Sequence, residues 1–250
     1  MENHSFSDIV KNASAPYWNS LSDRYGLATN YTGVAHPSEP NYIALFSGST
    51  QGVTDDGVHD FASRNLADQL EAAGRTWRVV AENVPPDCFT GAAASGGPDG
   101  TGTYVRKHEP AIMFQGIAGA PARCANIIGL RQFSLTAANF QLVVPNLCHD
   151  THDCPVADGD SFLKEFVDPI TASPAFARTL LVITYDEGTD DQGGGGSVAT
   201  VLVGPMVRSA VRSGIAHDHY SLLRTIENVW SLGCLGLSCS ANDLGEFFGP

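Results

Sequence analysis

Residues 179–188, Thr-Leu-Leu-Val-Ile-Thr-Tyr-Asp-Glu-Gly, form an apolar, β-rich run that ends on two adjacent carboxylates, Asp186 and Glu187. A continuous Leu-Leu-Val-Ile run is typical of a central parallel strand in a sheet that helices cover on both faces. Open α/β sheets bind ligands just beyond the carboxyl ends of such strands. The acid pair therefore indicates a metal site. The alternative is the start of a solvated loop, because the acidic, glycine-rich residues 189–196 follow.

A second apolar strand leads into polar residues in the same way. Residues 140–145 predict a strand, and residues 146–154 read Asn-Leu-Cys-His-Asp-Thr-His-Asp-Cys. A bridge between Cys148 and Cys154 would make this loop rigid, which suits catalytic placement of the side chains between them, His149, Asp150, His152 and Asp153. A structural disulfide loop with solvated polar residues is the alternative interpretation.

Helix and strand patterns alternate along the rest of the chain. Helices are predicted at residues 61–74, 160–170 and 220–232, and strands at residues 76–81 and 197–204. The aperiodic, Gly/Ala/Ser/Pro-rich residues 90–103 predict a loop. We therefore expect an α/β fold with a mainly parallel central sheet and helices on both faces, and the length of 250 residues suits a single domain, residues 1–250.

Two places offer groups suited to nucleophilic or anion chemistry. Ser49 and Thr50 stand at a glycine-flanked turn after a short predicted helix, residues 41–46. A hydroxyl held beside a metal or a helix N-terminus has the setting that a nucleophile needs, although Ser and Thr are also common in turns for conformational reasons. His219 begins the helix at residues 220–232, where the positive helix end lowers the pKa of an imidazole and favours a bound anion.

The charge balance limits the partners. With 14 basic and 27 acidic residues, the chain carries a formal net charge of −13, which argues against nucleic acid or an anionic membrane surface. A small phosphorylated substrate is compatible with this charge, because a bound metal ion supplies positive charge locally. Arg106 and Lys107 form a basic spot that we expect to balance nearby acids rather than to meet substrate. No apolar run is long enough to span a membrane, so stable membrane insertion is not expected.

Six cysteines favour three disulfides in a protein outside the cytosol. Two pairs are close in sequence, Cys148 with Cys154 and Cys234 with Cys239. Reduced cytosolic thiols are the alternative. The sequence shows no signal-peptide pattern. It begins directly on Met-Glu-Asn-His-Ser, without a strand before that stretch. We therefore expect a secreted protein whose sequence is cut short at its N-terminus.

Six motifs in this order closely resemble the phosphoesterase family that holds bacterial phospholipases C and acid phosphatases, within the alkaline-phosphatase-like superfamily. The motifs are Met-Glu-Asn-His-Ser from Met1, His-Pro-Ser-x-Pro-Asn-Tyr from His36, Ser-Gly-Ser-Thr from Ser47, Pro-Asn-x-Cys-x-Asp-x-His-Asp-Cys from Pro145, Thr-Tyr-Asp-Glu-Gly from Thr184 and His-Tyr-Ser-Leu-Leu-Arg-Thr-Ile-Glu from His219. The resemblance covers nearly the whole chain.

This resemblance implies hydrolysis of phosphate esters by a hydroxyl nucleophile beside a divalent metal ion of undetermined identity. Carried over by motif, the metal ligands are Glu2, Asn3, Asp186 and Glu187. The nucleophile falls on Ser49, with Thr50 as the alternative. Three histidines would bind phosphate oxygens or protonate the leaving group, namely His36, His152 and His219. A phosphoseryl intermediate, followed by attack of water, is the implied course.

Family members have a strand directly before the Glu-Asn motif, and here it is missing, so Glu2 and Asn3 are expected to hang from an unsupported terminus. Monoesterase activity like that of acid phosphatases is our first expectation, because a compact chain has little room for lipid-facing additions. A phosphodiesterase of the phospholipase C type is the first alternative. A non-catalytic remnant that binds phosphate or metal is the second, and oligomeric state stays open.

Overall fold

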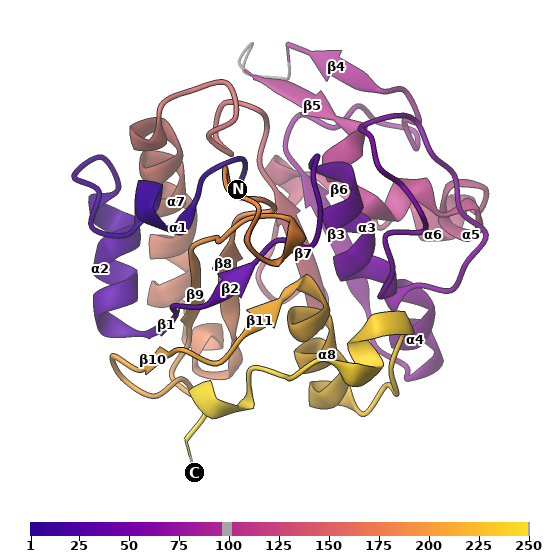
Figure 1. Cartoon of the computed structure of the whole chain (residues 1–250). Helices are drawn as coiled ribbons and strands as arrows, with labels where there is room; N and C mark the ends of the chain where they lie inside the picture. Colours follow the sequence, from indigo (N-terminus) through magenta and orange to yellow (C-terminus); the bar gives the residue numbers. More distant parts are fainter. Residues whose placement is uncertain (97–101, 250) are drawn as a thin grey trace.

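The computed structural model describes residues 1–96 and 102–249, and Figure 1 shows their arrangement. The α-helices are α1 (Phe6–Ile9), α2 (Pro16–Arg24), α3 (Glu39–Ser47), α4 (Leu66–Ala72), α5 (Gln115–Ala118), α6 (Pro121–Cys124), α7 (Val156–Ala172) and α8 (His219–Trp230). The strands are β1 (Gly26–Ala28), β2 (Tyr31–Thr32), β3 (Trp77–Ala81), β4 (Ala93–Ser95), β5 (Thr103–Val105), β6 (Ile127–Gly129), β7 (Phe140–Val144), β8 (Leu181–Thr184), β9 (Thr200–Val203), β10 (Arg212–Ser213) and β11 (His217–Asp218). Two 3₁₀ turns, η1 (Arg106–His108) and η2 (Pro110–Met113), follow β5.

The strands form two main sheets. One has the order β10-β1-β9-β8, and the other, β6-β3-β7, is parallel throughout. In Figure 1, α2 and α7 lie beside the four-stranded sheet, whereas α3, α4, α5 and α6 gather on the other side of the molecule around the three-stranded sheet. The predicted α/β class with helices around open sheets is confirmed.

Strand β8 departs from the expectation of a central parallel strand. It is the outer strand of the four-stranded sheet and pairs antiparallel with β9, with Ile183 opposite Val201. The apolar run reflects burial of the segment and carries no information about strand direction, because both directions can bury both faces when helices cover them. The acids Asp186 and Glu187 still follow its carboxyl end, as predicted.

Two apolar cores stabilise the fold. The first joins Trp18 of α2 and Val167 of α7 to the four-stranded sheet, and the second joins Phe46 of α3 to the three-stranded sheet. Leu45 and Ile226 pack against both cores. Helices α3 and α8 therefore connect the two sheets, and each of them begins at the region where the predicted site residues lie.

Capping explains where two helices begin. The side chain of Asn65 accepts hydrogen bonds from the amides of Ala67 and Asp68, and Asp68 bonds back to the Asn65 amide, so α4 begins at Leu66 and not near residue 61 as predicted. Asp218 accepts a hydrogen bond from the Ser221 amide at 2.9 Å and fixes the start of α8.

The three predicted disulfides are present, and they join Cys88 with Cys124, Cys148 with Cys154, and Cys234 with Cys239. The stretch 90–103, predicted to be a loop, contains β4 and the start of β5, which pair antiparallel. Residues 97–101 of that stretch lie outside the described residues. Among the helices that the structure describes, none combines the length and apolar character needed to cross a membrane.

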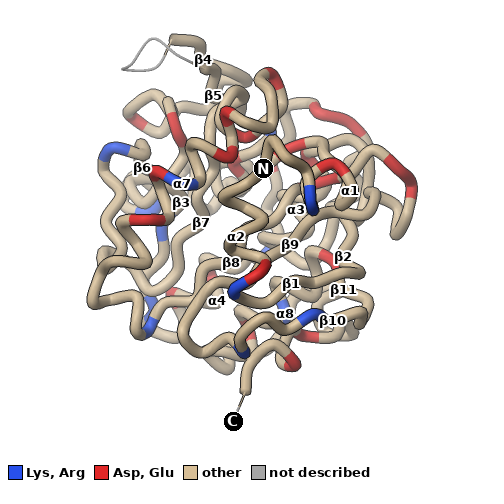
Figure 2. The backbone as a smooth tube through the Cα atoms, turned by 90° about the vertical axis from the view of Figure 1, so that its left-hand side faces the viewer, with Lys and Arg blue, Asp and Glu red and all other residues tan. Residues whose placement is uncertain are grey.

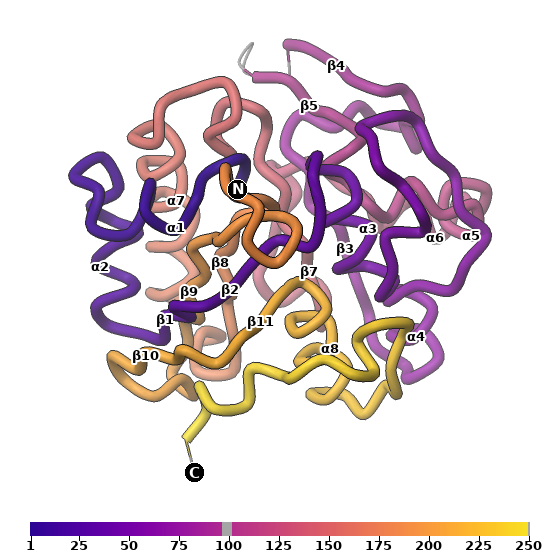
Figure 3. Tube along the Cα trace, in the orientation of Figure 1, coloured from indigo at the N-terminus to yellow at the C-terminus, as the bar shows by residue number. Residues whose placement is uncertain are grey.

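The N-terminal residues lie beside the segment after β8, as Figure 3 shows. The Asp186 amide donates to the Met1 carbonyl at 3.0 Å, and the Glu2 amide donates to the Asp150 carbonyl at 2.8 Å. The expectation of an unsupported ligand pair is therefore wrong, because main-chain hydrogen bonds hold it on both sides. Whether a further strand precedes these residues stays a prediction. Figure 2 shows many Asp and Glu residues on the segments around the N-terminus.

Candidate active site

Ser38 lies at the centre of the site, at the N-cap of α3. Its Oγ lies 3.1 Å from Oε2 of Glu2 and 3.0 Å from Oε1 of Glu187, so one hydroxyl stands between two carboxylates. Ser38 is 1% exposed. Pro40, in the first turn, helps α3 to begin here, because its fixed φ suits a helix start and its missing N–H costs no hydrogen bond there.

Glu2 is fully buried and surrounded by donors. It accepts hydrogen bonds from the Tyr42 hydroxyl and from Ser38, and Nε2 of His108 lies 3.2 Å from its Oε2. The His108 ring stacks on Tyr42 with centroids 5.1 Å apart. Burial alone would raise the pKa of Glu2, but the charge and hydrogen bond of His108 lower it to about 2. Burial alone would lower the pKa of His108, but Glu2, Asp150 and Asp186 raise it to about 9. The two groups form a buried ion pair.

Two more buried carboxylates flank this pair. Oδ2 of Asp150 lies 3.5 Å from Nδ1 of His108, and Asp186 accepts a hydrogen bond from the Asn3 amide at 3.2 Å. Burial and the negative charge of Glu2 both raise the pKa of Asp150, and they raise that of Asp186 well above its ordinary range. Within the described residues, Oδ2 of Asp186 has no hydrogen-bond partner, and Oδ2 of Asp150 has only its 3.5 Å contact with His108. A buried carboxylate oxygen without a partner is costly.

The donor set fits a divalent cation. Glu2, His108 and Asp150 offer ligand atoms within 4.8 Å of one another, and Asp186 and Glu187 are buried close by. Carboxylate oxygens are the ligands that hard and borderline divalent ions prefer. A cation would satisfy the unpartnered oxygen of Asp186 and offset the charge of the clustered acids. His108 and Asp150 are candidate donor groups that the motif-based prediction did not include.

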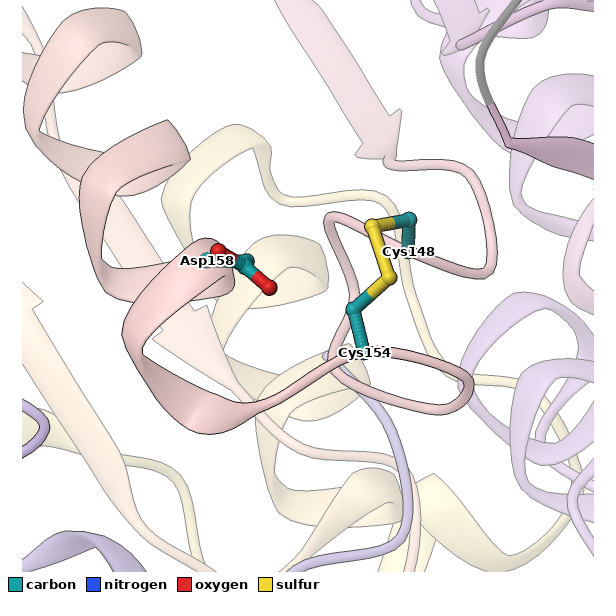
Figure 4. Close-up of side chains that lie close together, drawn as sticks. All are labelled: Cys148, Cys154 and Asp158. Carbon is teal, nitrogen blue, oxygen red and sulfur yellow. A yellow bond between two sulfur atoms is a disulfide. The ribbon is translucent and has the colours of Figure 1, made fainter.

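A second group of potential ligands does not support a metal site. Cys148, Cys154 and Asp158 lie close together, as Figure 4 shows, but the two sulfur atoms are bonded to each other. A disulfide sulfur lacks the thiolate charge that binds a metal. The bridge instead closes the loop that carries Asp150 and His152.

The three predicted histidines surround the site in different ways. His36 binds Glu187 through Nδ1 and the Asp190 carbonyl through Nε2; burial opposes its protonation, but these contacts raise its pKa on balance. His219 is buried between the Tyr31 hydroxyl and the Asp186 carbonyl, and burial lowers its pKa, so it is a neutral ring that holds the Asp186 main chain.

His152 is a partly exposed residue near the buried ion pair. Its side chain is 31% exposed, its Nδ1 lies 2.7 Å from Asp153, and its ring centroid lies 6.4 Å from that of His108. In the part of the chain that the structure describes, its Nε2 makes no hydrogen bond.

Asn3 adopts a left-handed backbone conformation with φ 55°. Such a conformation costs free energy, so its occurrence beside the acids indicates a constrained local geometry.

The structure does not bring Ser49 into this cluster. Ser38 precedes the nine-residue helix α3 and Ser49 follows it, and the Oγ of Ser49 accepts a hydrogen bond from the Gln51 amide. Thr50 continues the same turn.

Ser38, Tyr42 and His108 were missed as site residues. The signal for Ser38 was a Ser directly before a proline-containing helix start, within the motif that begins at His36.

The fold is that of the alkaline-phosphatase-like proteins. A crystal structure of a protein in the alkaline phosphatase superfamily from Vibrio parahaemolyticus matches with a TM-score of 0.59 at 11% identity, covering 93% of this chain and 64% of that one. At this identity the similarity shows the fold alone.

The sequence profile of the phosphoesterase family matches residues 7–233. The chain is 31% identical over 250 residues to a phosphatidylinositol-3-phosphatase of Mycobacterium tuberculosis, covering 99% of this chain and 80% of that protein. It is also 31% identical over 241 residues to a probable acid phosphatase of Kluyveromyces lactis, covering 92% of this chain and 57% of that protein. The chain therefore belongs to the phosphoesterase family. The resemblance predicted from the motifs is confirmed, and the names of these relatives agree with the predicted class of enzyme, an ester hydrolase.

Proposed function

We propose that this chain hydrolyses phosphate monoesters and that Ser38, rather than Ser49, is its nucleophile. The observation that carries the proposal is the position of the Ser38 hydroxyl, at the N-cap of α3 and within 3.1 Å of both Glu2 and Glu187. The positive end of the helix stabilises an oxyanion, and a neighbouring carboxylate accepts the hydroxyl proton.

The reaction follows from these residues. The Ser38 oxygen bonds to phosphorus as its proton passes to the Glu187 carboxylate, which accepts its hydrogen bond, and the bond from phosphorus to the leaving oxygen breaks. His152 donates a proton to that oxygen from its open Nε2. Water then attacks the phosphoserine and gives a proton to His152, the bond from phosphorus to the Ser38 oxygen breaks, that oxygen regains its proton from Glu187, and inorganic phosphate leaves. His36 and His219 act as positioning residues, because each holds one of the acids that follow β8.

A divalent metal ion completes the proposed site. Glu2, Asp186 and Glu187 would hold it, with Asn3, Asp150 and His108 beside them. When bound, such an ion lowers the pKa of a neighbouring hydroxyl and neutralises charge on the phosphoryl group. The unpartnered oxygen of buried Asp186 supports this assignment.

The substrate we propose is a small phosphate monoester, supported by the two relatives that are named as phosphatases. A single domain over residues 1–250 is supported by Leu45 and Ile226, which join the two cores. Export from the cytosol is supported by the three disulfides.

The test is hydrolysis of p-nitrophenyl phosphate by the wild-type chain, Ser38→Ala and Ser49→Ala, each with divalent metal and with a chelator. The proposal expects a loss of at least about a thousandfold in kcat for Ser38→Ala, near wild-type turnover for Ser49→Ala, and no turnover with the chelator. Turnover that survives in Ser38→Ala and disappears in Ser49→Ala would restore the prediction made from the sequence.

Preferential hydrolysis of a phosphocholine diester over the monoester would indicate the phosphodiesterase alternative. Metal binding by the folded protein without turnover of either ester would indicate the non-catalytic alternative.

A further inference from the structure

A carboxylate from another part of the chain lies directly beside the proposed nucleophile. Oδ1 of Asp56 accepts a hydrogen bond from the Glu39 amide at 3.0 Å, and its Oδ2 lies 2.7 Å from Nζ of Lys107. Glu39 is the first residue of α3 and follows Ser38. An anion therefore already holds both an amide at the positive end of this helix and a lysine ammonium.

The position of Lys107 is set by the active site itself. It belongs to η1, and its neighbour in that turn, His108, contacts Glu2. The Lys107 ammonium contacts Asp56 at 2.7 Å. Its side chain is 19% exposed.

These contacts are the ones that a phosphoryl group requires. Phosphate oxygens bind to amides at helix N-termini and to lysine ammonium groups. A substrate must also displace something to reach Ser38, which is 1% exposed. Asp56 is the accessible member of the arrangement, with 30% of its side chain exposed.

The chain around Asp56 allows this displacement. Nη2 of Arg106 holds the His59 carbonyl at 2.9 Å and Asp60 at 2.7 Å, so the far end of the segment 55–60 stays fastened. Val58, between these anchors and Asp56, is 59% exposed and packs little. Exchange of the Asp56 carboxylate therefore breaks only its contacts with the Glu39 amide and Lys107, while Arg106 still holds His59 and Asp60.

We propose that Asp56 is a built-in competitor of the substrate, whose phosphoryl group displaces the Asp56 carboxylate and takes over its contacts with Lys107 and the Glu39 amide. The inference rests on the proposed function, because it names the phosphate-binding groups of that same site. Lys107 thus contacts substrate, which the sequence had favoured less, and the acid that balances it is a placeholder for the phosphoryl group.

The test is the affinity for inorganic phosphate, measured by isothermal titration calorimetry on the full chain. The buffer contains the divalent ion that supports most turnover, or Mg²⁺ if none does. Asp56→Asn keeps an oxygen that accepts from the Glu39 amide but removes the competing charge, so phosphate should bind about tenfold more tightly. Lys107→Met should weaken phosphate binding about tenfold or more.

The matched control is Asp55→Asn, which removes the same charge one residue earlier. Asp55 contacts His59 and the Gly57 amide rather than Lys107, so phosphate affinity should stay within about twofold of wild type, as for an exposed charge. Thermal unfolding of each variant verifies that it is folded. Unchanged or weaker phosphate binding in Asp56→Asn, an equal gain in Asp55→Asn, or unchanged binding in Lys107→Met would overturn the inference.

The calorimetric measurement separates this inference from the proposed function. Phosphate binding that follows the expected pattern without any ester hydrolysis would leave the inference standing and remove the proposed reaction. Ester hydrolysis together with a phosphate affinity that Asp56→Asn does not change would leave the proposed reaction standing and remove the inference about Asp56.

Discussion

Asp186→Asn should change the stability of the protein in opposite directions with and without metal. Asp186 is buried, one of its oxygens has no hydrogen-bond partner among the described residues, and burial and the charge of Glu2 raise its pKa well above its ordinary range. In metal-free protein, folding therefore disfavours the ionised form of Asp186. The asparagine is isosteric, keeps the oxygen that accepts from the Asn3 amide, and places a donor toward Glu2, whose hydrogen bond with Asp186 favours the neutral acid.

The magnitude follows from the burial of that oxygen. A buried polar group without a partner costs about 1–3 kcal/mol. Since 1 kcal/mol shifts Tm by roughly 2–4 °C in a chain of this size, metal-free Asp186→Asn should unfold roughly 2–12 °C above wild type. With metal at about a hundredfold excess over Kd, wild type gains about 2.7 kcal/mol, and the variant, which has lost a ligand, gains much less.

The pH dependence has a definite sign. Because the folded-state pKa of Asp186 is raised, the folded protein binds the proton more tightly than the unfolded chain does. The stability that this proton contributes is complete below the ordinary pKa of the carboxyl and is lost as pH rises toward the raised value. The metal-free gap between Asp186→Asn and wild type should therefore be small at acid pH and widen toward neutral pH.

The assay is thermal unfolding by circular dichroism, with chelator and with metal, across acid to neutral pH. Asp191→Asn is the matched control, because it removes the same charge from a fully exposed side chain whose contact with His36 is a 3.8 Å surface ion pair of little energetic weight. It should match wild type in every condition. If Asp186→Asn unfolds at a lower temperature than wild type without metal, or gains as much stability from metal as wild type does, the acids that follow β8 do not form a cation site.

Two further predictions concern the scaffold. Asp160 of α7 accepts hydrogen bonds from two amides at the start of α2, at 2.9 and 2.7 Å. Asp160→Ala should therefore lower the free energy of unfolding, measured by urea denaturation, by about 2–4 kcal/mol. A loss below about 0.5 kcal/mol would show that Asp160 does not cap α2. Replacing Cys148 and Cys154 with Ser should cost about 2 kcal/mol and also most of the turnover, because that bridge closes the loop carrying Asp150. Replacing Cys234 and Cys239 with Ser, which opens a disulfide loop of similar size, should cost similar stability but leave kcat unchanged. Equal losses of kcat in the two double variants would contradict a special role of the Cys148–Cys154 bridge in turnover.

The sequence predicted the parts of the site that depend on local pattern. The acids after β8 and the loop closed by Cys148 and Cys154 follow strands whose composition identifies them, although β8 and β7 belong to different sheets. The antiparallel direction of β9 was not predictable in this way, because apolar content reports burial and not direction.

The groups that the sequence missed are joined by contacts between distant segments. Ser38 and Ser49 both stand at an end of α3 with similar local signals, and only the approach of Glu2 and Glu187 distinguishes them. Likewise, His108 lies in a 3₁₀ turn without a strong pattern and contacts Glu2, which lies 106 positions earlier. Such pairings arise from tertiary packing, which local periodicity does not encode.

The position of phosphate on the quenched enzyme tests the central claim most directly. The protein would be acid-quenched during turnover of a phosphate monoester, digested, and its peptides sequenced by mass spectrometry. The account predicts phosphoserine at Ser38 in wild type and its absence in chelator-treated protein. Phosphate on Ser49 or Thr50, or turnover with no phosphorylated peptide, would contradict it.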